Sequence, residues 1–208
     1  MASNKPDIAS NTDIASTVDI IFRYEPLSGD VQQIKQLVKS TGFFNDEEIE
    51  VAGELVEERI DKGDKSGYYF VFAQKKNLSS AESNGIISHE DLSRSPEKRC
   101  PIIFEEEKLL GYGCYGPIPG TLSSHDIYWI AVKPDLHRHG LGRILLERME
   151  SLISDSGGTR IYVETSMQPK YVTTRTFYER CGYRLETVLE HFYSPGDGKA
   201  IYCKSFSS

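Results

Sequence analysis

The sequence lacks the features of a membrane protein, of a secreted precursor and of a nucleic-acid-binding protein. No stretch approaches the roughly eighteen consecutive apolar residues that a membrane helix needs. The N-terminus has no basic segment followed by an apolar one, so we expect a cytoplasmic protein without a signal peptide. Lysine and arginine number 24 against 31 aspartate and glutamate, and this net charge of −7 argues against nucleic acid as a partner.

Cysteine is also scarce, and its spacing fits neither a disulfide framework nor a zinc site. The sequence has no CxxC pair and no Cys/His cluster with metal-ligand spacing, so we expect no structural disulfide and no metal. Cys114, Cys181 and Cys203 lie in apolar stretches and are typical of small core residues. The four are Cys100, Cys114, Cys181 and Cys203.

What is present is typical of one globular domain of ordinary size. Hydrophobic residues make up 38% of the 208 and aromatic residues 11%, enough to bury a core. Residues 1–17, where the segment DIAS occurs twice among polar residues, are predicted to be a flexible tail. Residues 18–206 form the predicted domain, interrupted by a polar surface insertion at about 77–100 that has little periodicity.

Two helices are predicted after a first strand at 18–24. Ser28 is the expected N-cap of the first helix and Gly42 ends it. Asn45, with Glu48 three residues later, forms a capping box for the second helix. The apolar side of that second helix consists of Ile49, Ala52, Val56 and Ile60, and Gly63 lies just beyond its end.

The remaining elements alternate in a way that predicts a mixed α/β sheet. Strands are expected at 68–73, 109–115, 126–132, 161–163, 183–193 and 200–206. A helix at 141–152 carries Leu141, Ile144, Leu145, Met149 and Leu152 on one side, and a shorter helix spans about 172–181. The order β-α-α-β-β-β-α-β-α-β-β places a parallel βαβ crossover near the middle of the sheet.

The stretch most informative about chemistry is 130–143, a strand followed by a tight loop and a helix. Gly140 and Gly142 allow a sharp turn and a close approach of the backbone to a ligand. The unpaired amides of the first helical turn, with the helix dipole, form an anion site that suits a pyrophosphate. The alternative is a glycine-rich turn that merely enters a core helix. The basic residues of the loop, opposed only by Asp135, are Lys133, His137, Arg138, His139 and Arg143.

Neither the dinucleotide fingerprint GxGxxG nor the phosphate-loop pattern GxxxxGK[ST] is present. Instead, residues 137–142 (HRHGLG) resemble the GNAT acetyltransferase signature (Gln/Arg)-x-x-Gly-x-(Gly/Ala), with His137 in the first position. Residues 177–183 (FYERCGY) resemble the family's late helix, Tyr-x-x-x-Gly-(Phe/Tyr). The family's asparagine early in that helix is missing, and Tyr171 or Thr173 occupies its region. The resemblance covers about 18–206.

The resemblance implies that acetyl-coenzyme A binds where two parallel strands, 126–132 and 160–165, splay apart, with no metal. Backbone amides of 130–132 would pair with the pantetheine arm, and one could polarise the thioester carbonyl. The implied cofactor-binding residues are Ile130, Ala131, Val132, His137, Arg138, His139, Gly140, Leu141, Gly142, Arg143 and Thr173.

Two residues are candidates for the catalytic chemistry. Tyr178 corresponds to the family's tyrosine near the sulfur, where it would donate a hydrogen bond to the leaving thiolate; otherwise it is a core aromatic. Asp126 lies where some members place a catalytic glutamate. It could accept the proton of the amine, directly or through water, or bind its ammonium group, or simply begin a strand. His125, its neighbour, is expected on the opposite face of the strand.

The predicted reaction is direct attack of a primary amine, favoured to be that of a small molecule, on acetyl-CoA in a ternary complex. Candidate acceptor-binding residues are Phe43, Phe44, Tyr128 and Glu164. Other tyrosines, among them Tyr68, Tyr112 and Tyr115, fit an aromatic pocket and core packing equally well. The alternatives are acetylation of a protein or peptide amine, and a non-catalytic acyl-CoA sensor. The sequence is compatible with a homodimer as well as with a monomer.

Overall fold

A computed structural model describes residues 20–75 and 108–206. The predicted tail at 1–17 and the predicted insertion at 77–100 both lie outside these residues. In the two described ranges, no helix is long and apolar enough to cross a membrane.

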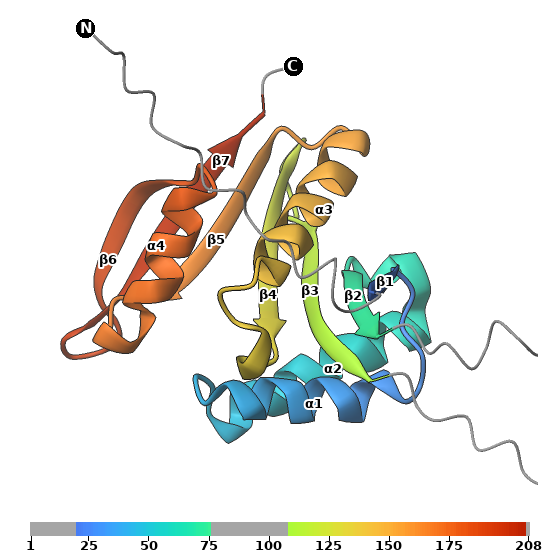
Figure 1. The fold of residues 1–208 in the computed structure, drawn as a ribbon. Coiled ribbons are helices and arrows are strands. Elements are labelled where there is room, and N and C mark those ends of the chain that lie inside the picture. The colour runs from blue at the N-terminus through green and yellow to red at the C-terminus, as the bar shows by residue number, and fades with distance from the viewer. Residues whose placement is uncertain (1–19, 76–107, 207–208) are drawn as a thin grey trace, which may run out of the picture.

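The described chain folds around one seven-stranded mixed sheet, as the sequence predicts (Figure 1). The strand order is β1-β2-β3-β4-β5-β7-β6; β4 and β5 are parallel, and every other neighbouring pair is antiparallel. The strands are β1 (Ile20–Arg23), β2 (Tyr69–Lys75), β3 (Leu109–Pro117), β4 (Ser124–Val132), β5 (Arg160–Ser166), β6 (Arg184–Ser194) and β7 (Asp197–Ser205). The α-helices are α1 (Asp30–Thr41), α2 (Asp46–Lys62), α3 (Leu141–Asp155) and α4 (Val172–Arg180). The predicted order of elements is therefore confirmed.

Helices cover both faces of the sheet and divide the core in two. On one face α1 and α2 pack over β2, β3 and β4, around the buried rings of Phe70, Phe72 and Tyr112. On the other face α3 and α4 enclose a second core that includes Met149, Tyr178 and strand residues from β2 to β7. The two helix layers leave the α1–α2 side of β5, β7 and β6 without a helix of its own (Figure 1).

The first two helices begin differently from one another. The capping box of α2 is confirmed: the Asn45 side chain accepts from the Glu48 amide and the Glu48 carboxylate accepts from the Asn45 amide, both at 2.8 Å. The N-cap predicted at Ser28 is wrong, because α1 begins at Asp30 after Gly29. The Asp30 carboxylate, held by Arg23 at 2.7 Å, accepts from the Leu27 amide and so fixes the chain that leads into α1, which has no side-chain cap.

Two predicted helix faces are rotated relative to the observed ones. On α2, Ile60 is 46% exposed, and the preceding Arg59 is buried instead because its guanidinium pairs with Glu25 at 2.8 Å. On α3, Ile144 and Leu152 are only half-buried, and Leu146 and Ile153 complete the core face.

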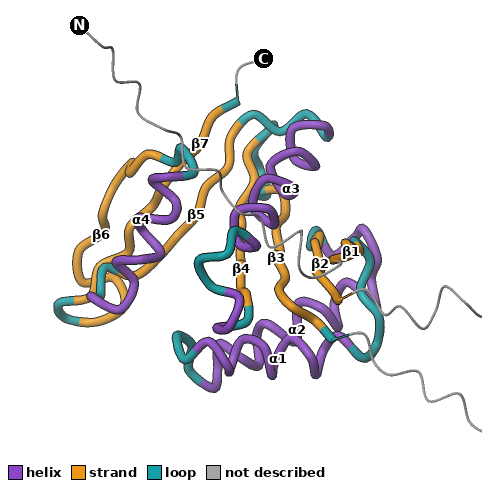
Figure 2. Tube along the Cα trace, viewed as in Figure 1, coloured by secondary structure: helices purple, strands orange, loops and turns teal. Residues whose placement is uncertain are grey.

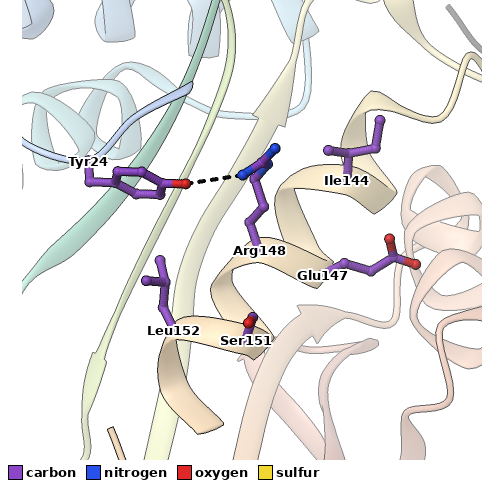
Figure 3. Close-up of a pocket in the computed structure, with 6 residues that line it drawn as sticks. All are labelled: Tyr24, Ile144, Glu147, Arg148, Ser151 and Leu152. Atoms are coloured by element: carbon purple, nitrogen blue, oxygen red, sulfur yellow. Dashed lines mark hydrogen bonds between the residues drawn. The ribbon is translucent and has the colours of Figure 1, made fainter. Parts of the chain in front are cut away.

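The half-buried side of α3 forms a shallow pocket against the segment that follows β1 (Figure 3). Arg148 donates to the Tyr24 hydroxyl at 3.1 Å, and its guanidinium lies 3.7 Å from the centre of the Phe22 ring. Cation–π contacts of this kind stabilise the packing of α3 on β1, the edge strand of the sheet. The pocket therefore belongs to the packing of α3 on β1.

The end of β2 and the beginning of β3 lie side by side and are hydrogen-bonded to each other. Gln74 pairs with Leu109, and the Lys75 amide donates to the Lys108 carbonyl at 3.3 Å. Strand ends held this close can be connected by a short hairpin loop.

We therefore expect a variant in which a short Gly/Ser linker replaces 77–98 to melt cooperatively, within about 5 °C of the parent, and to bind coenzyme A unchanged. Loss of cooperative melting by calorimetry would show that the segment belongs to the core.

Candidate active site

The central parallel pair of strands separates partway along its length. β4 pairs with β5 only from Ser124–Arg160 to Ile127–Val163, although β4 continues to Val132 and β5 to Ser166. Figure 1 shows the two strands diverging beyond this point. Backbone groups of β4 that face β5 beyond Ile127 therefore have no partner strand among the described residues. An extended ligand can pair with such groups.

A β-bulge lies where the separation begins. The register between β3 and β4 shifts between Cys114–Trp129 and Tyr115–Ile127, which leaves Tyr128 as the extra residue. Ile127, Ile130 and Val132 pack on the α3 side, whereas Trp129 packs on the α1–α2 side. Because a bulge bends its strand and changes the direction of its side chains, this one turns the end of β4 away from β5.

The loop between β4 and α3 leads into the N-terminus of α3 (Figure 2). This N-terminus has no side-chain cap. Gly140 has φ +90°, in the left-handed region, and a methyl group built on it would meet no atom within 4 Å. The first helical hydrogen bond of α3 runs from the Ile144 amide to the Gly140 carbonyl at 3.0 Å. The amides of 141–143 precede it and have no acceptor within the helix. Space above Gly140 and a set of outward-pointing donors fit a phosphate group.

Some basic side chains of the loop are bonded to other groups of the protein, whereas Arg138 is exposed. His137 turns back into the loop, where its Nε2 donates to the Val132 carbonyl at 2.9 Å, and Arg143 pairs with Glu147 at 2.8 Å. His139 donates from Nδ1 to the His137 carbonyl at 2.9 Å. Arg138, exposed and with φ +64°, holds the loop in a left-handed turn. The His137 side chain therefore shapes the loop, and Arg138 is the better placed cation for an anionic ligand.

The second sequence motif packs directly against this loop. A methyl group built on Gly142 would lie 3.9 Å from the Phe177 ring, an ordinary van der Waals contact between α3 and α4. Tyr178, the next residue, is buried with its ring 5.6 Å from Tyr183 and 6.4 Å from Tyr202. This burial raises the pKa of Tyr178 above its ordinary value near 10. The phenol therefore stays protonated and can act as a hydrogen-bond donor.

The two residues considered in place of the family's asparagine have different surroundings. Thr173 lies exposed in the first turn of α4. Tyr171 precedes the helix, and its hydroxyl donates to the Phe43 carbonyl at 3.0 Å while the two rings lie 5.6 Å apart. Tyr171 therefore anchors the connection between α1 and α2, which leaves Thr173 as the candidate for a cofactor contact.

Asp126 and Glu164 lie on the sheet face opposite α4. Asp126 is the register partner of Tyr162, and Glu164 is two residues further along β5 on the same side. Burial, assisted by the negative charge of Glu164 and opposed by Lys199, raises the pKa of Asp126 to about 6. The Glu164 carboxylate pairs with the Lys199 ammonium at 2.6 Å. Asp126 is thus a carboxylate whose proton affinity suits acid–base chemistry near neutral pH.

Aromatic residues line this side of the sheet to different depths. Tyr128 is partly exposed and lies 5.5 Å from Tyr68, edge to face. Phe44 packs on Trp129 at 4.7 Å, so its ring supports β4, whereas Phe43 lies beside Tyr171. The other two tyrosines left open by the sequence, Tyr112 and Tyr115, are buried in the two cores.

His125 lies apart from this group. Its Nδ1 is buried and has no hydrogen-bond partner among the described residues. A methyl group built on Gly158, just after α3, would come within 2.9 Å of that nitrogen, which places the ring near the end of α3. Burial lowers the pKa of His125. The imidazole faces away from Asp126 and is unsuited to serve as its partner.

Sequence reasoning missed Lys199 as part of the site. The only sequence signal is local: Lys199 alternates with Ala200 in a strand after a Pro-Gly turn, so the two side chains face opposite sides of the sheet. Its partner Glu164 is 35 residues away in the sequence, and the register that joins them appears only in the folded sheet. In the described parts of the chain, no three His, Cys, Asp or Glu side chains gather as a metal site would require.

Comparisons with known proteins show what the chain and its fold are similar to. The sequence model described as the acetyltransferase (GNAT) family matches residues 72–183. A crystal structure of a GNAT-family protein from Desulfovibrio desulfuricans is 38% identical, with a TM-score of 0.74, over 89% of this chain and 98% of that one. An aminoglycoside 6′-N-acetyltransferase crystallised with coenzyme A shares the fold at 15% identity, with a TM-score of 0.60, over 90% of this chain and 98% of its own.

A curated relative matches a shorter region. The alanine N-acetyltransferase of ribosomal protein bS18 from Escherichia coli strain K12 is 30% identical over 79 residues, which are 38% of this chain. The chain spans about half the length of this relative, 52%.

Proposed function

From the premise that this chain belongs to the GNAT acetyltransferase family, we propose that it transfers an acetyl group from acetyl-CoA to a primary amine. The observation that carries the proposal is the end of β4, which has no partner strand on its β5 side among the described residues, beside a loop with free amides. Acetyl-CoA supplies the acetyl group as a thioester. The chain's own residues bind this co-substrate, orient the amine and manage the protons.

Binding of the co-substrate rests on backbone groups. The amides of 141–143 and the open space at Gly140 receive the phosphates, with Arg138 and the N-terminus of α3 adding positive charge. The backbone of Ile130, Ala131 and Val132 pairs with the pantetheine arm. One amide donor of this stretch directed at the thioester carbonyl oxygen would stabilise the charge that develops there, by about 3 kcal/mol. Thr173 lies exposed in the first turn of α4, the helix that packs against α3 at Gly142.

Asp126 receives the amine. As a carboxylate it first attracts the acceptor ammonium, and with a pKa of about 6 it can take a proton from it directly or through water. The neutral amine nitrogen then bonds to the thioester carbon within the ternary complex, the carbon–sulfur bond breaks, and coenzyme A leaves as its thiolate. The nitrogen of the adduct releases its extra proton to water, which leaves the amide. We assign Phe43, Tyr128 and Glu164 to the acceptor site. Tyr128 and Glu164 lie near enough to Asp126 to interact with it electrostatically, and Phe44 packs on Trp129 of β4.

Tyr178 acts on the departing sulfur. Its raised pKa makes full proton transfer to a thiolate of ordinary pKa near 8.5 unfavourable, so its hydroxyl donates a hydrogen bond instead. The interaction forms as charge appears on the sulfur.

We therefore expect Tyr178→Phe to lower kcat about tenfold and to leave coenzyme A affinity within about threefold of the parent value.

The matched control for this variant is Tyr183→Phe. Tyr183 is equally buried and its ring lies 5.6 Å from Tyr178, but it belongs to the turn after α4. Its hydroxyl has the Glu150 carboxylate of α3 as a neighbour and is assigned no part in the reaction, so its removal should leave kcat unchanged. Stopped-time assays of thiol release at saturating acetyl-CoA measure both. Parental kcat in Tyr178→Phe would assign the sulfur's partner to water or another group.

The acceptor class that we propose first is a small primary amine. A second candidate, the amine of a protein or peptide, is favoured by the similarity to the ribosomal-protein alanine acetyltransferase. Incubation with acetyl-CoA and a panel of small amines and alanine-terminated peptides, with free thiol measured, tests both. Thiol release above the rate without acceptor identifies the class. Coenzyme A binding without release from any acceptor would instead support the alternative of an acyl-CoA sensor.

A further inference from the structure

The chain places one of its own ammonium groups in the acceptor region. The Lys199 side chain is only 14% exposed, and its Nζ lies 2.6 Å from the Glu164 carboxylate. The same Nζ is 3.8 Å from the centre of the Phe192 ring and 5.8 Å from that of Tyr193. A carboxylate combined with aromatic faces is the environment in which proteins bind alkylammonium ligands.

This ammonium lies beside Asp126 on the same face of the sheet. Val163 and Ala200 face the α3–α4 core, so Glu164 and Lys199, which alternate with them, face the other side. Asp126 lies next to Tyr162 on this side and is close enough for the charges of Glu164 and Lys199 to act on it. Together the three side chains carry two negative charges and one positive charge. Among these three, one negative charge is left to pair with an incoming ammonium group.

We propose that Lys199 is a specificity-determining residue that occupies an ammonium subsite at Glu164 and restricts the acceptor to amines with a single positive charge. The inference rests on the proposed function and names the substrate class of that same site. Glu164, a candidate in the sequence for binding the amine, is already neutralised by Lys199. Asp126 alone is left to bind the acceptor.

The restriction follows from the cost of displacing Lys199. A diamine could place its second ammonium at Glu164 only by moving the Lys199 ammonium out of its pairing with the carboxylate and the rings. Without that movement, the second charge of the diamine lies next to a charge of the same sign. A monoamine meets neither obstacle, because it needs only Asp126.

The test compares diamines and monoamines of matched length as acceptors of the full-length enzyme. The probes are 1,3-diaminopropane, 1,4-diaminobutane and 1,5-diaminopentane against propylamine, butylamine and pentylamine. In Lys199→Met, which keeps an apolar stem against Phe192, we expect the diamine-to-monoamine ratio of kcat/KM to rise about tenfold for the best-fitting length. The statistical advantage of two amino groups is the same in every variant and cancels.

Two single variants and one double variant test whether the change in this ratio comes from the charge of Lys199 and the freed Glu164 carboxylate. Lys199→Arg keeps the positive charge and should leave the ratio within about twofold of the parent. Lys170→Met is the matched control, because Lys170 donates to the Phe43 carbonyl at 2.9 Å nearby without pairing with Glu164, and it should also leave the ratio unchanged. Lys199→Met combined with Glu164→Gln should lose the gain, since the freed carboxylate is then absent. A ratio that stays at the parental value in Lys199→Met overturns the proposal.

Failure of the proposed function would be visible separately. If the parent releases thiol with none of the six amines, transfer to these alkylamines is excluded, and the same ratio is then measured as calorimetric affinities for coenzyme A-saturated protein. A rise in the affinity ratio for Lys199→Met supports the ammonium subsite even then, and an unchanged ratio rejects it. If Lys199→Met does not fold, judged by melting, Lys199→Gln takes its place with the same expectations.

Discussion

Replacing Asp126 with asparagine is expected to lower kcat/KM for amine acetylation about 100-fold at neutral pH, the lower range for removal of a general base. The substitution removes the negative charge that attracts the acceptor and the group that takes its proton, but keeps the size of the side chain. Coenzyme A affinity should stay within about threefold of the parent, because the loop at Gly140 is at the other end of the separated strands.

The division of this loss between kcat and KM separates the two roles proposed for Asp126. A proton acceptor acts in the transition state, so its loss lowers kcat. A group that only binds the ammonium stabilises ground and transition states alike, so its loss raises KM at unchanged kcat. Asp135→Asn, which removes one exposed carboxylate from the β4–α3 loop, is the matched control and should change neither. Full activity of Asp126→Asn would exclude both roles.

The raised pKa of Asp126 adds a pH dependence. Because the carboxylate must be ionised to act, kcat/KM of the parent should fall as pH drops through about 6, and Asp126→Asn should lose this dependence. For stability the sign is opposite. A carboxyl pKa higher in the folded than in the unfolded state favours the protonated form on folding, so stability is lost as pH rises from about 4 to about 6.

At neutral pH the parent therefore carries a destabilising charge that the asparagine variant lacks. A pKa of about 6 against an ordinary value near 4 corresponds to at most about 2–3 kcal/mol, and solvent screening of this partly buried group reduces it to about 1 kcal/mol. Asp126→Asn should be more stable than the parent by this amount at pH 7 and equal to it near pH 4. A lower melting temperature at pH 7 would contradict the origin assigned to the shift.

The parts of the fold that the sequence predicted are those specified by neighbouring residues. The capping box of Asn45 and Glu48 needs only three residues, and the glycine that ends α1 acts through its own backbone angles, with φ +71° at Gly42. The loop around Gly140 was predicted for the same reason. Its left-handed backbone and free helix N-terminus are local properties of a strand, a turn and a helix.

The parts that were missed depend on contacts between distant segments. Ile60 is excluded from the core because Arg59 pairs with Glu25, which lies 34 residues away, and helical periodicity alone does not register such a pairing. The bulge at Tyr128 exists only in the register of β3 against β4. The Glu164–Lys199 ion pair likewise requires the order β5-β7-β6, in which the last two strands are exchanged relative to the chain.

The catalytic assignments depend on both neighbouring residues and contacts between distant segments. Asp126 and Tyr178 were selected by their place in the sequence pattern, and the structure adds the reason for their proton affinities. Burial raises both pKa values, but Asp126 also has Glu164 and Lys199 as charged neighbours. A carboxylate near its working pH and a phenol that holds its proton are suited to opposite tasks, one accepting a proton and the other donating a hydrogen bond. These assignments stay predictions until the variants are measured.

Gly140→Val is expected to weaken coenzyme A binding at least about thirtyfold, or about 2 kcal/mol. Two effects combine. The side chain would enter the open space above the loop, where no protein atom lies within 4 Å and where the phosphates are proposed to bind. A β-branched residue also resists φ +90°, at a cost of roughly 1–2 kcal/mol, and tends to turn the adjacent amides out of position. Calorimetric titration with coenzyme A measures the loss.

The matched control separates ligand exclusion from backbone strain. Gly157, at the other end of α3, has φ +88° and the same open surroundings, so Gly157→Val imposes a comparable backbone cost far from the loop. It should lower the melting temperature about as much as Gly140→Val but leave coenzyme A affinity unchanged. Gly142→Ala should be tolerated in both respects, because its methyl group makes only ordinary contacts of 3.8 Å with Val132 and 3.9 Å with Phe177. If Gly140→Val folds and binds coenzyme A like the parent, the phosphates do not bind at this helix N-terminus, and the co-substrate must be held elsewhere along the separated strands.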